Sequence, residues 1–147
     1  MTDIKSPEAR SYNMASVRSK NTKLELRLKN ALMLQGLKPL SHDEYVTKYG
    51  ESLVGSPDAI FPEARLAIFC DGCFWHGCPL HYQLPATRQD FWRKKIEENI
   101  ARDRRVDAAL TTAGWRVKRI WGHELKKKNL DRVVEDIIKL LNNPTGF

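Results

Sequence analysis

Two short apolar runs lead directly into a cluster of cysteines and histidines, and this junction constrains the fold more than any other part of the chain. The runs are "DAIF" (58–61) and "RLAIFC" (65–70), separated by "PEA" with Pro62 at the junction. Short apolar runs on either side of a proline predict two antiparallel strands joined by a tight turn. The cluster "DGCFWHGCPLHY" (71–82) begins where the second strand ends. We therefore expect a sheet that presents a chemically active loop at one end.

The remaining elements are predicted from apolar periodicity and from helix start and stop signals. They are a helix from Thr22 to Gly36, a loop over 41–57, a long helix over 88–113, a strand at "WRVKRIW" (115–121) and a last helix at about 130–142. The order αββαβα around a small mixed sheet predicts an α/β or α+β sandwich. No repeat or low-complexity tract interrupts it, so residues 22–147 are expected to form one domain.

Charge predicts a polyanionic partner. The chain of 147 residues has 25 Lys+Arg against 18 Asp+Glu, a net charge of +7, and it is most simply explained by binding to nucleic acid. Residues 1–21 are polar and basic and are interpreted as an arm that contacts DNA through Arg18 and Lys20; a frayed terminus is the alternative. No apolar run is long enough to span a bilayer and the N-terminus lacks a secretory signal, so a cytoplasmic location is expected.

Carboxylates mark the hairpin as a metal site of the magnesium type. With a turn centred near Ala64, Asp58 is expected opposite Cys70 or Asp71, with Cβ atoms about 5 Å apart. Such neighbours repel each other unless a cation lies between them. The layout resembles the PD-(D/E)xK nucleases, although Cys73 stands where the usual lysine would be. The alternative is that Asp58 merely follows a proline in a turn.

Three further polar residues have both a structural and a functional interpretation. Asn99 and Asp103 lie on the apolar face of the long helix. Because a buried carboxylate is costly without a partner, Asp103 either pairs with an arginine or lies near a metal or basic group of the active site. Glu25 either completes a capping box with Thr22 or belongs to the same site.

The cysteines indicate a zinc site. Crowding of three cysteines into nine positions favours metal over disulfides. Cys73, Cys78 and His81 supply three ligands, and structural zinc needs four. His123 is the best candidate for the fourth by position, and the competitors are Cys70, His76 and His42.

Phe74 and Trp75 lie inside this loop, beside two glycines. A loop held by zinc would project the two rings as a rigid apolar wedge of the kind that DNA-bending proteins insert between base steps. The alternative is that both rings cover the core.

Five stretches together resemble one known family, the very short patch repair endonucleases, over about residues 10–140. They are "RSYNMASVRSKNTKLE" (10–25), "GSPDAIF" (55–61), "IFCDGCFWHGCPLH" (68–81), "PATRQDFWRKKIEENIARDRRV" (85–106) and "GWRVKRIWGHEL" (114–125). The resemblance implies a restriction-endonuclease-like fold with structural zinc and catalytic Mg²⁺. It also implies a monomeric bacterial enzyme that nicks one strand 5′ of the T in a T:G mismatch, where 5-methylcytosine has been deaminated. Mismatch-repair proteins and a DNA cytosine-5 methyltransferase are the implied functional partners.

The resemblance also implies roles for individual residues. Asp58 binds Mg²⁺ together with the main-chain carbonyl of Cys70, and His76 is the general base. The remaining assignments are Asp71, Glu25 and Asp103 to the active site; Cys73, Cys78, His81 and His123 to zinc; and Phe74, Trp75 and Met14 to intercalation at the mismatch. The family often has cysteine where this chain has His123, and often glutamate where it has Gly122. The alternatives are a restriction-type enzyme that cuts paired DNA and a zinc-stapled DNA-binding module without chemistry.

Overall fold

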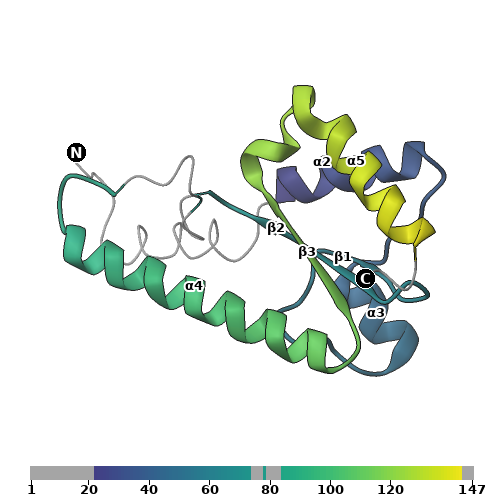
Figure 1. Cartoon of the computed structure of the whole chain (residues 1–147), viewed down its shortest axis with the longest axis horizontal. Coiled ribbons are helices and arrows are strands. Elements are labelled where there is room, and N and C mark those ends of the chain that lie inside the picture. The colour runs from purple at the N-terminus through teal and green to yellow at the C-terminus, as the bar shows by residue number, and fades with distance from the viewer. Residues whose placement is uncertain (1–21, 74–77, 79–83, 144–147) are drawn as a thin grey trace.

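A three-stranded mixed sheet forms the centre of the protein, which we describe from a computed structural model covering residues 22–73, Cys78 and residues 84–143 (Figure 1). The strands are β1 (Ala59–Phe61), β2 (Leu66–Asp71) and β3 (Arg116–Trp121), in the order β1-β2-β3. β1 and β2 are antiparallel, whereas β2 and β3 are parallel. This confirms the predicted hairpin and the mixed sheet, and the helices flank it on both faces.

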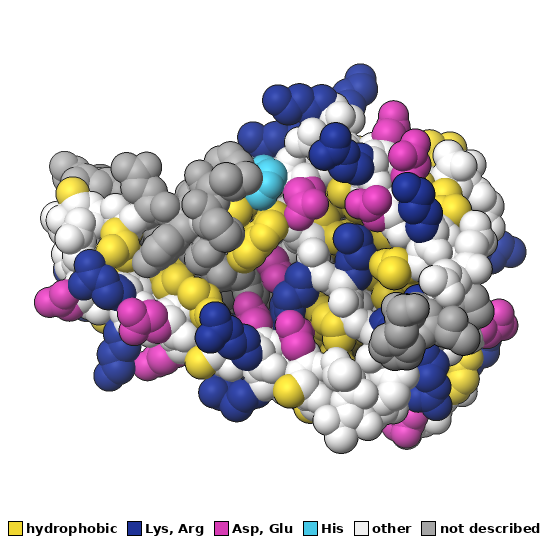
Figure 2. All heavy atoms as spheres, viewed as in Figure 1, with side chains coloured by type: hydrophobic (Ala, Val, Ile, Leu, Met, Phe, Trp, Pro, Cys, Tyr) yellow, Lys and Arg dark blue, Asp and Glu magenta, His cyan; other side chains and the backbone are white. Residues whose placement is uncertain are grey.

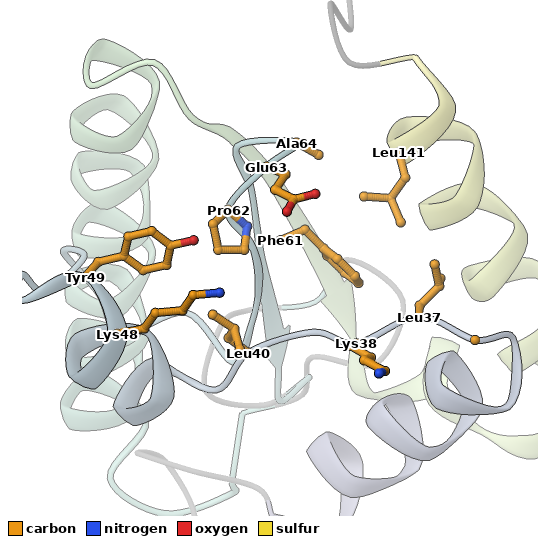
Figure 3. Close-up of a pocket in the computed structure, with 11 residues that line it drawn as sticks. Leu37, Lys38, Leu40, Lys48, Tyr49, Phe61, Pro62, Glu63, Ala64 and Leu141 are labelled. Carbon is orange, nitrogen blue, oxygen red and sulfur yellow. The ribbon is translucent and has the colours of Figure 1, made fainter.

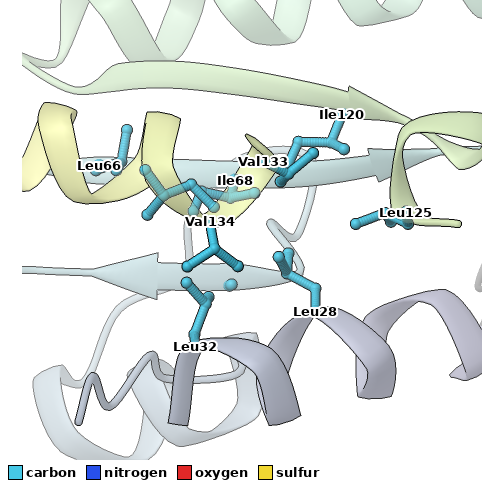
Figure 4. Close-up of a cluster of buried hydrophobic side chains, with 10 residues drawn as sticks. Leu28, Leu32, Leu66, Ile68, Ile120, Leu125, Val133 and Val134 are labelled. Carbon is cyan, nitrogen blue, oxygen red and sulfur yellow. The ribbon is translucent and has the colours of Figure 1, made fainter. Parts of the chain in front are cut away.

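Alternation along β2 divides the core into two layers. Leu66 and Ile68 face the helices α2 (Thr22–Leu34) and α5 (Lys127–Asn142), while Ala67 and Phe69 face α3 (His42–Tyr49) and α4 (Gln89–Thr112). The first layer is shown in Figure 4 and includes Leu28, Leu32, Leu66, Ile68, Ile120, Leu125, Val133 and Val134. Because burial of each such side chain stabilises the fold by about 1.5–3 kcal/mol, this layer fixes α2 and α5 against the sheet.

The predicted helix at the start of the described chain is confirmed as α2. Leu28 and Leu32 are buried, and Leu24 and Ala31 pack beside them, as the apolar stripe predicts. Gly36 adopts a positive φ of 80°, and the N–H of Leu37 donates to the carbonyl of Leu32 at 3.1 Å. A glycine in this left-handed conformation lets the chain leave the helix without strain.

The predicted loop over 41–57 is wrong in part, because residues 42–49 form the helix α3. Ser41 Oγ accepts the N–H of Glu44 at 3.1 Å, and the N–H of Ser41 donates to Glu44 Oε1 at 2.9 Å. This capping box is visible in the sequence "SHDE". The helix escaped prediction because it is short and buries only Tyr45, so it shows no apolar period.

The register of the hairpin differs by one residue from the expected register. Ala59 pairs with Ile68, and continuing this register places Asp58 opposite Phe69, not opposite Cys70 or Asp71. The turn is tight, with the N–H of Arg65 donating to the carbonyl of Pro62 at 3.1 Å and Arg65 at a positive φ of 50°. The one-residue difference arises because the turn is centred between Glu63 and Ala64.

The two C-terminal helices largely match their predictions. The predicted face of α4 is buried at Trp92, Ile96, Asn99, Val106 and Leu110. In Figure 1 the N-terminal part of α4 extends beyond the sheet. α5 begins at Lys127, three residues earlier than expected, after the short helix η1 (Gly122–Leu125). None of the helices that the structure describes is both long and apolar enough to cross a membrane.

Candidate active site and metal centre

Asp58 and Glu25 form a buried carboxyl pair between α2 and the sheet. Asp58 immediately precedes β1, and its Oδ2 accepts the N–H of Cys70 at 2.7 Å. Glu25, on the first turn of α2, is buried and shares a side-chain hydrogen bond with Asp58. A hydrogen bond between two carboxyl groups requires that one of them holds a proton. Of the two interpretations of Glu25, the geometry therefore supports the active-site one.

The surroundings of Asp58 oppose its ionisation. Burial raises the pKa of Asp58 to about 8, and the hydrogen bond and charge of Glu25 and the charge of Asp71 act in the same direction. The Cys70 N–H lowers the pKa, but by less. Burial likewise raises the pKa of the Cys70 thiol, and the neighbouring acids raise it further, so the thiol stays neutral at physiological pH. The group has an excess of acid for which a cation would be the natural counter-charge.

We expect the stability of the metal-free protein to fall as the pH rises. The pKa of Asp58 is about 8 in the folded state, against an ordinary value of 3.8. The folded state therefore holds a proton that the unfolded state loses, and the associated stability is complete below about pH 4 and is lost as the pH rises through 8. Chemical denaturation in chelator between pH 5 and 8.5 should show a slope that Asp58→Asn reduces, by at most about 1.4 kcal/mol per pH unit. Equal slopes for the two proteins would contradict the assignment.

A second acidic group lies on the α4 side of the sheet around Arg119. Arg119 Nη1 lies 3.1 Å from both carboxylate oxygens of Asp71 and 3.7 Å from Asp103 Oδ1. Its Nε donates to Asp107 Oδ1 at 2.8 Å. Burial alone lowers the pKa of Arg119, but the surrounding carboxylates outweigh it and the pKa is raised. Asp103 thus has the arginine partner that the structural interpretation required, within the acidic region visible at the centre of Figure 2.

Cys73, Cys78 and His123 converge at the end of β2. His123 Nδ1, in η1, lies 3.4 Å from Cys73 Sγ and 3.6 Å from Cys78 Sγ, and all three atoms lie within 4.8 Å of one another. Zn–S bonds of about 2.3 Å and Zn–N bonds of about 2.0 Å in a tetrahedron separate sulfur from nitrogen by about 3.5 Å. The three atoms therefore fit one zinc ion.

The competing fourth ligands lie elsewhere where the structure describes them. His42 Nε2 accepts the N–H of Leu53 at 3.1 Å, and Cys70 adjoins Asp58. The predicted site residues that fall outside the described residues are Met14, Arg18, Lys20, Phe74, Trp75, His76 and His81. Sequence reasoning did not name Arg119 and Asp107, although alternation in "WRVKRIW" places Arg119 on one face of β3.

A pocket of about 670 Å³ lies at the other end of the hairpin, around the turn at 62–64. Figure 3 shows Lys48 and Tyr49 of α3 directed toward Pro62, with Leu141 of α5 on the opposite side. None of the described candidate site residues lines this pocket. It is therefore separate from the acidic and Cys/His groups.

Acids at the strand ends of a helix-flanked mixed sheet are the arrangement of a nuclease, and the comparisons place this protein among the DNA endonucleases. A family profile described as "DNA mismatch endonuclease Vsr" matches residues 2–83. The chain belongs to the Vsr family of DNA mismatch endonucleases. This membership fits the restriction-endonuclease-like fold expected from the sequence.

Relatives from three bacteria support this membership. The chain is 46% identical over 127 residues to the type II nicking enzyme V.XorIIP of Xanthomonas oryzae pv. oryzae, covering 85% of this chain and 88% of the relative. It is 41% identical over 123 residues to the DNA mismatch endonuclease Vsr of Escherichia coli, covering 82% and 74%. It is also 38% identical over 128 residues to the type II nicking enzyme V.NaeI of Lentzea aerocolonigenes, covering 87% and 76%.

Proposed function

We propose that this protein is a Mg²⁺-dependent endonuclease that nicks one strand of duplex DNA 5′ of the T in a T:G mismatch. The observation that carries the proposal is the buried Asp58–Glu25 pair at the start of the hairpin, in a chain similar to a mismatch endonuclease and to nicking enzymes. The mismatches would arise where a cytosine-5 methyltransferase has acted. A cytoplasmic monomer that cooperates with mismatch-repair proteins completes the proposal.

Asp58 and the main-chain carbonyl of Cys70 would hold the magnesium ion. The fit is supported by the raised pKa of Asp58, because a divalent cation can replace the proton that the acidic surroundings now retain. When bound, Mg²⁺ stabilises the charged transition state and lowers the pKa of the attacking water. His76 would accept the proton of that water as general base, and Glu25 would orient the site from α2.

Zinc would fasten the loop that carries His76. Cys73, Cys78 and His123 fit three corners of the tetrahedron, and His81 is proposed for the fourth. A closed set of four ligands leaves no open position for substrate, so the ion would be structural. The loop from Gly72 to Gln83 contains few aliphatic side chains with which to hold itself.

Phe74 and Trp75 would read the mismatch by insertion, with Met14 entering from the other groove. Unstacking a base step costs a few kcal/mol, and least at a mismatch, so a fixed wedge favours the mispaired step. Residues 1–21 would act as an arm whose Arg18 and Lys20 contact phosphates without reading sequence.

We expect Trp75→Ala to lower the preference for T:G over T:A far more than it lowers affinity for paired DNA. The wedge contributes only where a step can be unstacked, whereas lysines and arginines contribute on every duplex. Binding titrations on both duplexes at several salt concentrations measure the two effects separately. Lys20→Gln is the control, and it should weaken both complexes alike and flatten the salt dependence. Equal weakening by Trp75→Ala on both duplexes would assign the ring to packing.

One cleavage experiment separates the proposal from its alternatives. A T:G heteroduplex and its paired homoduplex, each labelled in turn on both strands, are incubated with the protein and Mg²⁺. The proposal expects one nick, 5′ of the mismatched T, in the heteroduplex alone. Cleavage of both strands of the homoduplex would indicate a restriction-type enzyme. Retardation of both duplexes without cleavage would indicate a binding module.

A further inference from the structure

Arg119 holds the Asp71 carboxylate on the α4 side of the sheet. A single guanidinium nitrogen, Nη1, lies 3.1 Å from both carboxylate oxygens of Asp71. The Asp71 side chain is almost fully buried, whereas that of Arg119 is about one-fifth exposed. Charge-assisted hydrogen bonds of this kind are about twice as strong as neutral ones. The contact therefore fixes the direction in which Asp71 points.

Arg119 is itself anchored from three other directions. Its Nε and Nη2 both lie 2.8 Å from Asp107 Oδ1, and Nη2 donates to the main-chain carbonyl of Asp103 at 3.4 Å. The guanidinium also lies 4.3 Å from the centre of the Phe69 ring, on the strand residue that pairs with it in β2. A guanidinium held by two elements and a ring cannot follow Asp71 toward another site. Asp71 would have to leave Arg119 to bind a cation.

Asp58 has different neighbours, although the two acids lie at the ends of adjacent strands. Its contacts are the N–H of Cys70 and the carboxyl group of Glu25, both of which leave it without a positively charged side chain among the printed hydrogen-bond partners that define the pair. A cation would therefore find an uncompensated carboxyl pair at Asp58 and Glu25. At Asp71 it would find a carboxylate that is already neutralised.

We propose that Arg119 is a positioning residue that withholds Asp71 from the divalent cation, so that Asp58 and Glu25 are the carboxylates that face it. This inference rests on the cation site proposed above for Asp58. It gives the Asp71 position of this chain a structural partner instead of a ligand role. It also predicts that loss of Arg119 makes cation binding tighter, whereas loss of a residue that merely supports the site would make it weaker.

Mn²⁺ binding to the full chain, followed by the electron paramagnetic resonance of the free ion, tests the proposal without reference to activity. Asp58→Asn should weaken binding by about tenfold or more, whereas Asp71→Asn should change it by less than about twofold. Arg119→Met should strengthen binding by about tenfold, and Arg119→Lys, which keeps the charge, should change it less.

Two double variants of equal net charge separate a released ligand from a general change in charge. Arg119→Met with Asp71→Asn should bind Mn²⁺ as the wild type does, because the released carboxylate is gone. Arg119→Met with Asp107→Asn should keep the tighter binding, because Asp71 is still present and free. Equal affinity of the two double variants would overturn the proposal.

The single variant Asp71→Asn keeps the proposal open to refutation if Arg119→Met does not fold. A loss of Mn²⁺ affinity in Asp71→Asn as large as that in Asp58→Asn would show that Asp71 is a ligand, and the proposal would be wrong. Unchanged binding in Asp58→Asn would instead refute the cation site of the proposed function, whatever the result at Asp71. Thermal denaturation in chelator checks that each variant is folded.

Discussion

Replacing Asp58 by alanine is expected to abolish nicking and to leave mismatch binding largely intact. The carboxyl group of Asp58 is the centre of the buried acidic group, and its loss removes the proposed anchor of the catalytic ion. Loss of one such electrostatic contribution costs at least about 10²–10³-fold in rate. Binding depends on the wedge and on phosphate contacts, which the substitution does not touch. Single-turnover nicking of a labelled T:G duplex and a binding titration at matched protein and Mg²⁺ concentrations measure the two quantities.

Asp131→Ala provides the matched control for this experiment. Asp131 is an exposed acid on α5, so its removal changes the net charge by the same amount without altering the acidic group. The control should nick at the wild-type rate. Near wild-type nicking by Asp58→Ala would refute the assignment, whereas a loss of both nicking and binding would show that the substitution disturbs the fold.

Replacing Cys78 by serine is expected to remove zinc and to destabilise the protein. Cys78 is fully buried, its N–H donates to the carbonyl of Cys73 at 2.9 Å, and its sulfur lies beside His123. The proposed ion would link the end of β2 to η1 and hence to α5. Loss of a structural metal is among the most destabilising changes, on the order of 4 kcal/mol, which for a chain of this length lowers Tm by about 10 °C. Atomic absorption and calorimetry measure the two effects.

Cys70→Ser is the control, because Cys70 is a cysteine of the same strand end that lies outside the Cys/His group. This variant should retain one zinc ion per chain. Zinc loss in Cys70→Ser, with retention in Cys78→Ser, would reverse the assignment of ligands. If zinc can be stripped from the wild type without a change in Tm, the structural role itself is refuted.

Local patterns of the sequence predicted most of the elements correctly. The apolar stripe of α2, the hairpin around Pro62 and the buried face of α4 all follow from periods of 3.6 or 2, which depend only on residues a few positions apart. The same holds for the short spacing of Cys73 and Cys78. α3 was missed because a helix of eight residues with one buried side chain leaves almost no period, although its capping box was present.

The resemblance to the family likewise came from the sequence alone, because it rests on the identity and spacing of residues and not on their contacts. The family match and the relatives then confirmed it. The roles assigned to individual residues remain predictions until variants such as Asp58→Ala and Cys78→Ser are measured.

Only the tertiary structure decided which acids share a site. The pairing of Glu25 with Asp58, and of Asp71 with Arg119, joins residues that are 33 and 48 positions apart. Such contacts depend on the register of the hairpin, on the packing of α2 against one face and on the parallel pairing of β3 with β2. A shift of one residue in a strand turns its side chains to the opposite face, so no local pattern can determine which carboxylate meets a positive charge and which meets another acid.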